Sequence, residues 1–148
     1  MSALNAEELL SPGDLERVRE AVRKAEMRTS GEIRVHLDDT ITDDVMDHAA
    51  FVFEELGMHR TKDRNGALIY VSVADRRAAV IGDAGIHEKL PKGFWNETLG
   101  VILEQFRAER YAEGLCLGVE RLGEQLREHF PRVRDDRNEL SDEISIGR

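Results

Sequence analysis

The sequence predicts an α/β fold, a three-layer α/β/α sandwich around a small mixed β-sheet, with two helices at its C-terminal end. Residues 32–38 alternate strictly between polar and apolar side chains, which is typical of an edge strand with one face in solvent. Residues 66–73 are apolar on both faces, as expected for a central strand covered by helices on both sides. Residues 78–82 follow after a tight turn, which predicts an antiparallel hairpin.

The helices are predicted from caps and from apolar residues at helical spacing. Ser11 can cap a first helix, and Pro12 suits its first position. Thr42 is the expected N-cap of a second helix, which lies between the first two strands and therefore makes them parallel. Residues 94–110 and 111–130 form the last two helices.

Charge and composition exclude several classes of partner. The 148 residues carry 21 Lys and Arg against 30 Asp and Glu, a net charge of −9. Nucleic acids and anionic membranes are therefore not expected as partners, because both bind basic surfaces. The single cysteine, Cys116, is predicted to be buried and excludes a disulfide within the chain or a four-cysteine zinc site.

The expected organisation is one domain with loose ends. Residues 1–10 are predicted to be a flexible lead-in, residues 11–131 the folded domain, and residues 132–148 a charged, disordered tail. Neither a signal peptide nor an apolar stretch long enough to span a bilayer is evident, which predicts a cytoplasmic, prokaryotic protein.

The predicted topology brings acidic residues together at two opposite edges of the sheet. At the edge where the hairpin returns, carboxylates and an amide could bind Ca²⁺ or Mg²⁺, which prefer oxygen ligands. The predicted ligands are Asp63, Asn65, Asp83, Glu88 and Glu32, with His87 beside them. Three glycines, Gly66, Gly82 and Gly85, would let the backbone approach the ion. The alternative is that Asn65, Gly66, Gly82 and Gly85 only form turns and that the acidic side chains at this edge are solvated surface groups.

A secondary acidic site is expected at the carboxyl ends of the two parallel strands. Asp38, Asp39 and Asp75 lie there, at the edge where open α/β sheets commonly bind ligands. Arg76 and Arg77 could bind phosphate or simply flank the hairpin turn. No catalytic residue is assigned, because no nucleophile–base pair can be assembled from the sequence alone.

Two segments of the sequence stand out, DRNGALIYV at 63–71 and RRAAVIGDAGIHE at 76–88. Both resemble the TPM domain, the family of thylakoid-lumen acid-phosphatase-like and photosystem-repair proteins and their bacterial relatives. The similarity extends from about Leu15 to Phe130. The resemblance implies the same α/β sandwich, and it implies cation binding at Asp63, Asn65, Gly66, Gly82, Gly85 and Glu88.

The sequence also departs from the family pattern. The apolar or glycine-rich extension of exported, membrane-anchored relatives is absent, which predicts a soluble branch. The aromatic residue often found between the two loop glycines is replaced by Asp83 and Ala84, which puts a shared catalytic geometry in doubt.

Three functions are compatible with these features. The first is a cation-binding accessory module without strong catalysis, with a protein partner and no membrane. The second is a weak metal-dependent acid phosphatase, in which Asp83 or Glu88 is the acid or base and His87 or Arg64 neutralises the phosphate. The third is a scaffold that holds a partner through its charged tail and its acidic surface.

Overall fold

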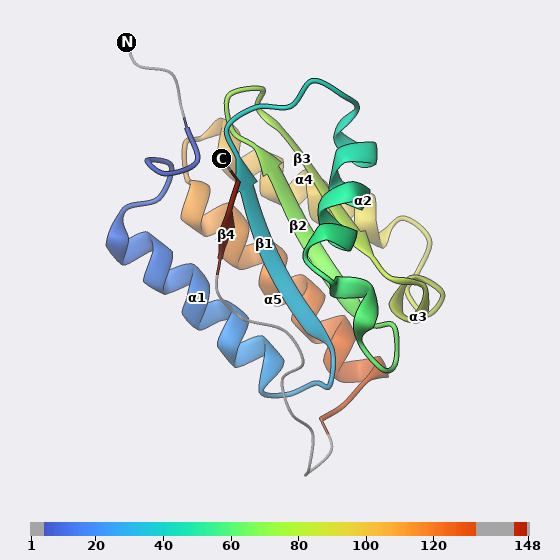
Figure 1. Ribbon diagram of the computed structural model, residues 1–148. Coiled ribbons are helices and arrows are strands. Elements are labelled where there is room, and N and C mark those ends of the chain that lie inside the picture. The colour runs from blue at the N-terminus through green and yellow to red at the C-terminus, as the bar shows by residue number, and fades with distance from the viewer. Residues whose placement is uncertain (1–4, 133–143, 148) are drawn as a thin grey trace.

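Within residues 5–132 and 144–147, which the computed structural model describes, a four-stranded mixed sheet has the strand order β3-β2-β1-β4 (Figure 1). Its strands are β1 (Glu32–Asp38), β2 (Gly66–Ser72), β3 (Arg77–Gly82) and β4 (Ser145–Ile146). β1 is parallel to both β2 and β4, whereas β2 and β3 form an antiparallel hairpin. The predicted parallel pair and the predicted hairpin are thus both confirmed.

Helices cover both faces of the sheet, as the α/β/α prediction requires (Figure 1). One face packs against α1 (Pro12–Glu26), α4 (Phe94–Arg107) and α5 (Tyr111–His129). The other face is covered by α2 (Val45–Glu55) and the short 3-10 helix η1 (Met58–Arg60). A further short helix, α3 (Ala84–His87), follows β3, where the sequence predicted only a loop.

The central strand β2 explains why both layers are needed. Ile69 and Val71 point into the apolar layer beneath α1 and α5, and Leu68 and Tyr70 point toward α2. All four side chains are buried. Because alternate residues of a strand face opposite sides, a strand that is apolar at every position is stable only between two helical layers.

The predicted N-cap of α1 is confirmed, whereas the predicted N-cap of α2 is wrong. The Ser11 hydroxyl accepts a hydrogen bond from the Asp14 N–H, as predicted for the start of α1. The N-cap of α2 is Asp44 rather than Thr42. Its carboxylate accepts hydrogen bonds from the N–H groups of Met46 and Asp47, which satisfies two otherwise unpaired donors.

β1 is not the edge strand with a solvent-facing side that its alternation predicted. β4 lies along its outer edge, with Ser145 opposite His36 and Ile146 opposite Leu37. On the face of β1 that was predicted to be in solvent, Glu32 is 1% exposed and His36 is 8% exposed. The imidazole of His36 stacks on the ring of Tyr70. The side chains of Glu32 and His36 are therefore part of the interior, and those of Arg34 and Asp38 are partly buried.

Parts of both predicted loose ends contribute to the packed structure. Ala6 and Leu10 are buried in the core beside α1 and α5. Near the other end, residues 144–147 include β4, and Ile144 and Ile146 pack against the same core. Residues 1–4, 133–143 and 148 of the predicted lead-in and tail lie outside the described ranges.

The start of β1 is joined to the end of α5. The Ser30 N–H donates a 3.0 Å hydrogen bond to the carbonyl of Phe130, and Thr29 forms an isolated antiparallel bridge with Pro131. Leu126 contacts Gly31 so closely that a Cβ at this glycine would lie 2.6 Å from its methyl group. These contacts hold α5 against the sheet at a sequence separation of about one hundred residues.

Candidate functional site

The hairpin-return edge brings the predicted backbone segments together. The Gly85 N–H donates a 2.9 Å hydrogen bond to the carbonyl of Arg64, and the Asp83 N–H donates one of 2.9 Å to the carbonyl of Gly66. The loop before β2 and the segment after β3 are therefore in direct contact, as the topology predicted.

At this edge Asp83 is already engaged by a cation of the protein. Its carboxylate lies 2.6 Å from Nε and 2.9 Å from an Nη of Arg64. The same carboxylate accepts a 2.7 Å hydrogen bond from the Ala84 N–H and so caps α3. A bidentate arginine and a helix N-terminus both compensate the charge, so an ion would have to displace Arg64 to bind Asp83.

The other predicted ligands of this edge differ in burial. Glu32 lies opposite Gly66 in the β1–β2 register and is buried, as is Asn65. Asp63 and Glu88 are exposed. Among the residues that the structure describes, there is no group of three or more His, Cys, Asp or Glu side chains placed to hold a metal ion.

Asn65 is nevertheless unusual at this edge. It is 1% exposed, and its amide nitrogen lies 3.3 Å from the Ser30 hydroxyl. Its Oδ1 is buried and has no hydrogen-bond partner within the described part of the chain. A buried carbonyl oxygen without a donor is costly and needs an explanation.

The three glycines serve contacts between segments of the protein. A Cβ on Gly85 would overlap the backbone carbonyl of Asp63, and a Cβ on Gly82 would overlap the ring of Trp95. At Gly66, a Cβ would lie 3.0 Å from the carbonyl of Met58. At these three positions glycine lets neighbouring backbone and side chains of the protein pack closely together.

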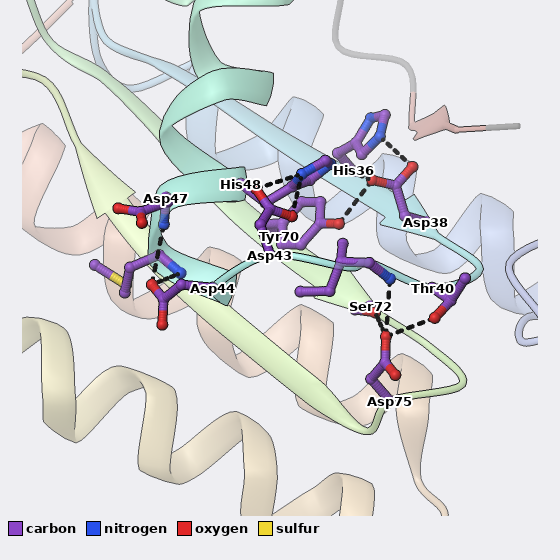
Figure 2. Close-up of polar contacts among 12 residues, drawn as sticks. His36, Asp38, Thr40, Asp43, Asp44, Asp47, His48, Tyr70, Ser72 and Asp75 are labelled. Carbon is purple, nitrogen blue, oxygen red and sulfur yellow. Dashed lines mark hydrogen bonds and ion pairs between the residues drawn. The ribbon is translucent and has the colours of Figure 1, made fainter.

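The carboxyl edge holds a larger polar cluster, centred on Asp38 (Figure 2). Oδ2 of Asp38 accepts a 2.7 Å hydrogen bond from the Tyr70 hydroxyl, and Oδ1 lies 2.9 Å from Nε2 of His36. His48 of α2 places its Nε2 3.5 Å from the same carboxylate. The side chain of Asp38 is 14% exposed, so these contacts replace most of its hydration.

His48 joins a second carboxylate to the cluster. Its Nδ1 lies 2.9 Å from Oδ1 of Asp43, while its Nε2 faces Asp38. Figure 2 shows this imidazole between the two aspartates. Helical spacing cannot pair His48 with Asp38, because His48 lies on α2 and Asp38 lies on β1.

Asp75 organises the turns at the ends of β1 and β2. Its Oδ2 accepts hydrogen bonds from the Ser72 hydroxyl at 2.6 Å, the Thr40 hydroxyl at 2.8 Å and the Ile41 N–H at 2.9 Å (Figure 2). These three donors, that of Ser72 foremost, hold the pKa of Asp75 below its ordinary value. The folded domain therefore keeps this carboxylate ionised.

Asp39 lies in the same turn region and is exposed. Its Oδ1 accepts a 2.7 Å hydrogen bond from the Ala6 N–H. Asp38, Asp39 and Asp75 thus have neutral donors or histidines as partners, and none forms an ion pair with a lysine or arginine in the described ranges. Arg77 acts on Asp75 through its charge without forming an ion pair, so the charge at this edge is less directly compensated than that of Asp83.

Three further residues singled out by the sequence are Cys116, Arg76 and Arg77. Cys116 is 5% exposed, and burial raises the pKa of its thiol, which is the behaviour of a structural cysteine. Arg76 has a left-handed φ of 55° in the β2–β3 turn, and the side chains of Arg76 and Arg77 are exposed.

No helix among the described residues combines the length and apolarity needed to cross a lipid bilayer.

Comparison with solved structures identifies close similarity in fold. The BA42 protein from the psychrophilic bacterium Bizionia argentinensis is 42% identical, with a TM-score of 0.88 over 97% of this chain and 99% of that one. The N-terminal domain of a protein from P. gingivalis is 25% identical, with a TM-score of 0.71 over 88% of this chain and 86% of that one.

A third structure is similar in fold alone. The N-terminal domain of the cg2496 protein from Corynebacterium glutamicum is 12% identical, with a TM-score of 0.63 over 79% of this chain and 74% of that one. No curated protein matches the chain. The family model TPM_phosphatase, described as the TPM domain, matches residues 4–125, and the chain therefore belongs to the TPM domain family.

Proposed function

We propose that this TPM domain is an accessory module that binds Ca²⁺ or Mg²⁺ at the carboxyl edge of its sheet and holds a protein partner, without strong catalysis. The observation that supports this site is the unequal compensation of charge. Asp83 is paired with Arg64, whereas the hydrogen-bond donors to Asp39 and Asp75 are neutral in the described part of the chain, and Arg77 acts on Asp75 only through its charge without an ion pair. A hydrated cation therefore displaces no positive side chain at the carboxyl edge.

The carboxylates of Asp39 and Asp75 suit an ion that keeps much of its hydration shell. Asp75 receives its three donors on one oxygen, Oδ2, and Asp39 uses Oδ1, so each carboxylate has a second oxygen for an ion. Both residues are exposed at the adjoining ends of β1 and β2. Mg²⁺ is commonly bound by one or two carboxylates with waters completing its octahedron, and Ca²⁺ accepts a looser set of oxygens.

The hairpin-return edge is the alternative location for the same ion. The unpartnered Oδ1 of the buried Asn65 favours it, because an oxygen ligand without a donor is available there. Asp63 and Glu88 could add carboxylates, but Asp83 would first have to leave Arg64.

A titration followed by NMR distinguishes the two edges. With ¹⁵N-labelled protein and added MgCl₂ or CaCl₂, we expect amide shifts at residues 38–41 and 74–75. The Asp39→Asn/Asp75→Asn double variant should bind about tenfold or more weakly, since each change removes an anionic ligand. Asp83→Asn is the matched control and should bind like the wild type.

Two outcomes would contradict the proposal in different ways. Shifts confined to residues 63–66 and 83–88, lost in Asp83→Asn, would move the site to the other edge. No saturable shift with either ion would remove cation binding altogether.

A weak metal-dependent acid phosphatase is the second candidate. It is favoured by the position of two imidazoles, those of His36 and His48, within 3.5 Å of the Asp38 carboxylate, since such groups can move protons. A cation at the adjacent Asp75 could polarise a phosphoryl oxygen. Metal-dependent turnover of an aryl phosphate that is lost in Asp38→Asn but kept in Asp83→Asn would support it, and equal rates in all three proteins would exclude it.

A further inference from the structure

Residues 144–147, here called the strap, lie along the outer edge of β1. Ser145 and Ile146 form the two-residue strand β4, and the Gly147 N–H donates a 2.8 Å hydrogen bond to the carbonyl of Leu37. On one side of the strap, Nε of Arg34 donates a 3.0 Å hydrogen bond to the Ser145 hydroxyl. Ile144 and Ile146 pack against the core.

The strap lies directly on the His36–Asp38 pair. A Cβ added to Gly147 would overlap Oδ1 of Asp38 and would lie 3.0 Å from Nε2 of His36. Glycine is therefore the residue that allows the backbone to approach this carboxylate so closely. With the strap in place, the side chains of His36 and Asp38 are 11% and 14% exposed.

The attachment of the strap is slight compared with the rest of the sheet. β1 pairs with β2 over seven positions but with β4 over two. All four strap residues keep part of their surface in solvent. Short segments with few buried apolar contacts open at a much lower free energy than the whole domain.

We propose that the strap is a gate on Asp38: when docked it excludes a cation from this carboxylate, and when released it adds Asp38 to the ligands at the carboxyl edge. The gate rests on the proposed cation binding at Asp39 and Asp75. Since the ion prefers the released state, the coupling is reciprocal: release strengthens ion binding, and ion binding promotes release.

Two substitutions in the full chain test the gate from opposite sides of the strap. Gly147→Ala places a methyl group on Asp38, and Ile146→Asn removes an apolar anchor without adding a charge near the ion. Without metal, amide hydrogen exchange at residues 145–147 should be about tenfold faster or more in both variants, because fewer contacts oppose local opening. Gly100→Ala is the control, since a Cβ on this exposed helical glycine meets nothing within 4 Å.

The ion is then added to the same proteins. With MgCl₂ or CaCl₂, both strap variants should bind several-fold more tightly than the wild type, and the amide of Asp38 should shift further than it does in the wild type. Unchanged exchange in both strap variants would overturn the gate, and so would faster exchange with an ion affinity equal to that of the wild type. Faster exchange without ion binding in any protein would instead overturn the proposed function, and with it the gating of a cation.

Discussion

The hydroxyl of Tyr70 donates a 2.7 Å hydrogen bond to Oδ2 of Asp38, so the central strand is tied to the polar cluster at the carboxyl edge. Tyr70, a residue of β2, is fully buried on the side of the sheet that α2 covers. Burial, and after it the hydrogen bond to Asp38, raises the pKa of this hydroxyl, which therefore remains a donor well above neutral pH.

Tyr70→Phe removes this donor and leaves the ring in place. We expect the free energy of unfolding to fall by about 1.5–3 kcal/mol, the usual contribution of a hydrogen bond to a charged group. Urea unfolding at neutral pH measures the change. In an Asp38→Asn background the same substitution should cost less, since the charged acceptor is gone, and an equal cost in both backgrounds would rule out this coupling.

Asp75→Asn should lower the melting temperature at neutral pH. The donors on Asp75 depress its pKa in the folded state, so its contribution to stability is complete above the pKa of the unfolded chain and is lost as the pH falls through the lower folded-state value. The difference between variant and wild type should therefore shrink below about pH 4. Calorimetry across this range tests the sign, with Glu55→Gln, at an exposed helical position, as control.

Asp83→Ala should destabilise the domain by about 1 kcal/mol, because α3 loses its N-cap and Arg64 loses its carboxylate. Asp83→Ser keeps a capping oxygen without the charge and should recover part of that loss. Chemical unfolding of both variants separates the two contributions. Equal stability of the Ala and Ser variants would mean that the cap contributes nothing.

Gly85→Ala should cost about 1–3 kcal/mol, because its new methyl group would overlap the backbone carbonyl of Asp63 and force the two segments apart. Gly100→Ala is the matched comparison, since this site in α4 is open. That variant should be neutral or more stable by about 0.5–1 kcal/mol, as alanine is the better helix former. A similar effect at both positions would contradict the close contact at Gly85.

The strands and helices were predictable where a residue pattern has a single structural explanation. Residues 66–73 are apolar on both faces, and the central strand β2 lies there. The pattern of residues 32–38 correctly predicts a strand, but alternation cannot distinguish a polar side chain in solvent from one hydrogen-bonded inside the protein. β4 was not predictable at all, because two residues carry no periodicity and their partner strand lies far away in sequence.

The candidate sites show the same limit. Topology was sufficient to predict that the segments around Arg64 and Asp83 meet, because strand order determines where loops emerge. It could not predict that these two side chains would neutralise each other, since that depends on side-chain conformation. The approach of His48 to Asp38 likewise depends on how α2 lies across the sheet.

The junction between Ser30 and Phe130 bears on synthesis of the chain. The apolar face of β1 packs with side chains of α5, and the two segments are about one hundred residues apart. During translation, β1, β2 and β3 leave the ribosome before α5 has been made. The part of this apolar face that α5 covers therefore stays exposed until residues 111–130 emerge, and over that interval the nascent sheet is open to non-native contacts.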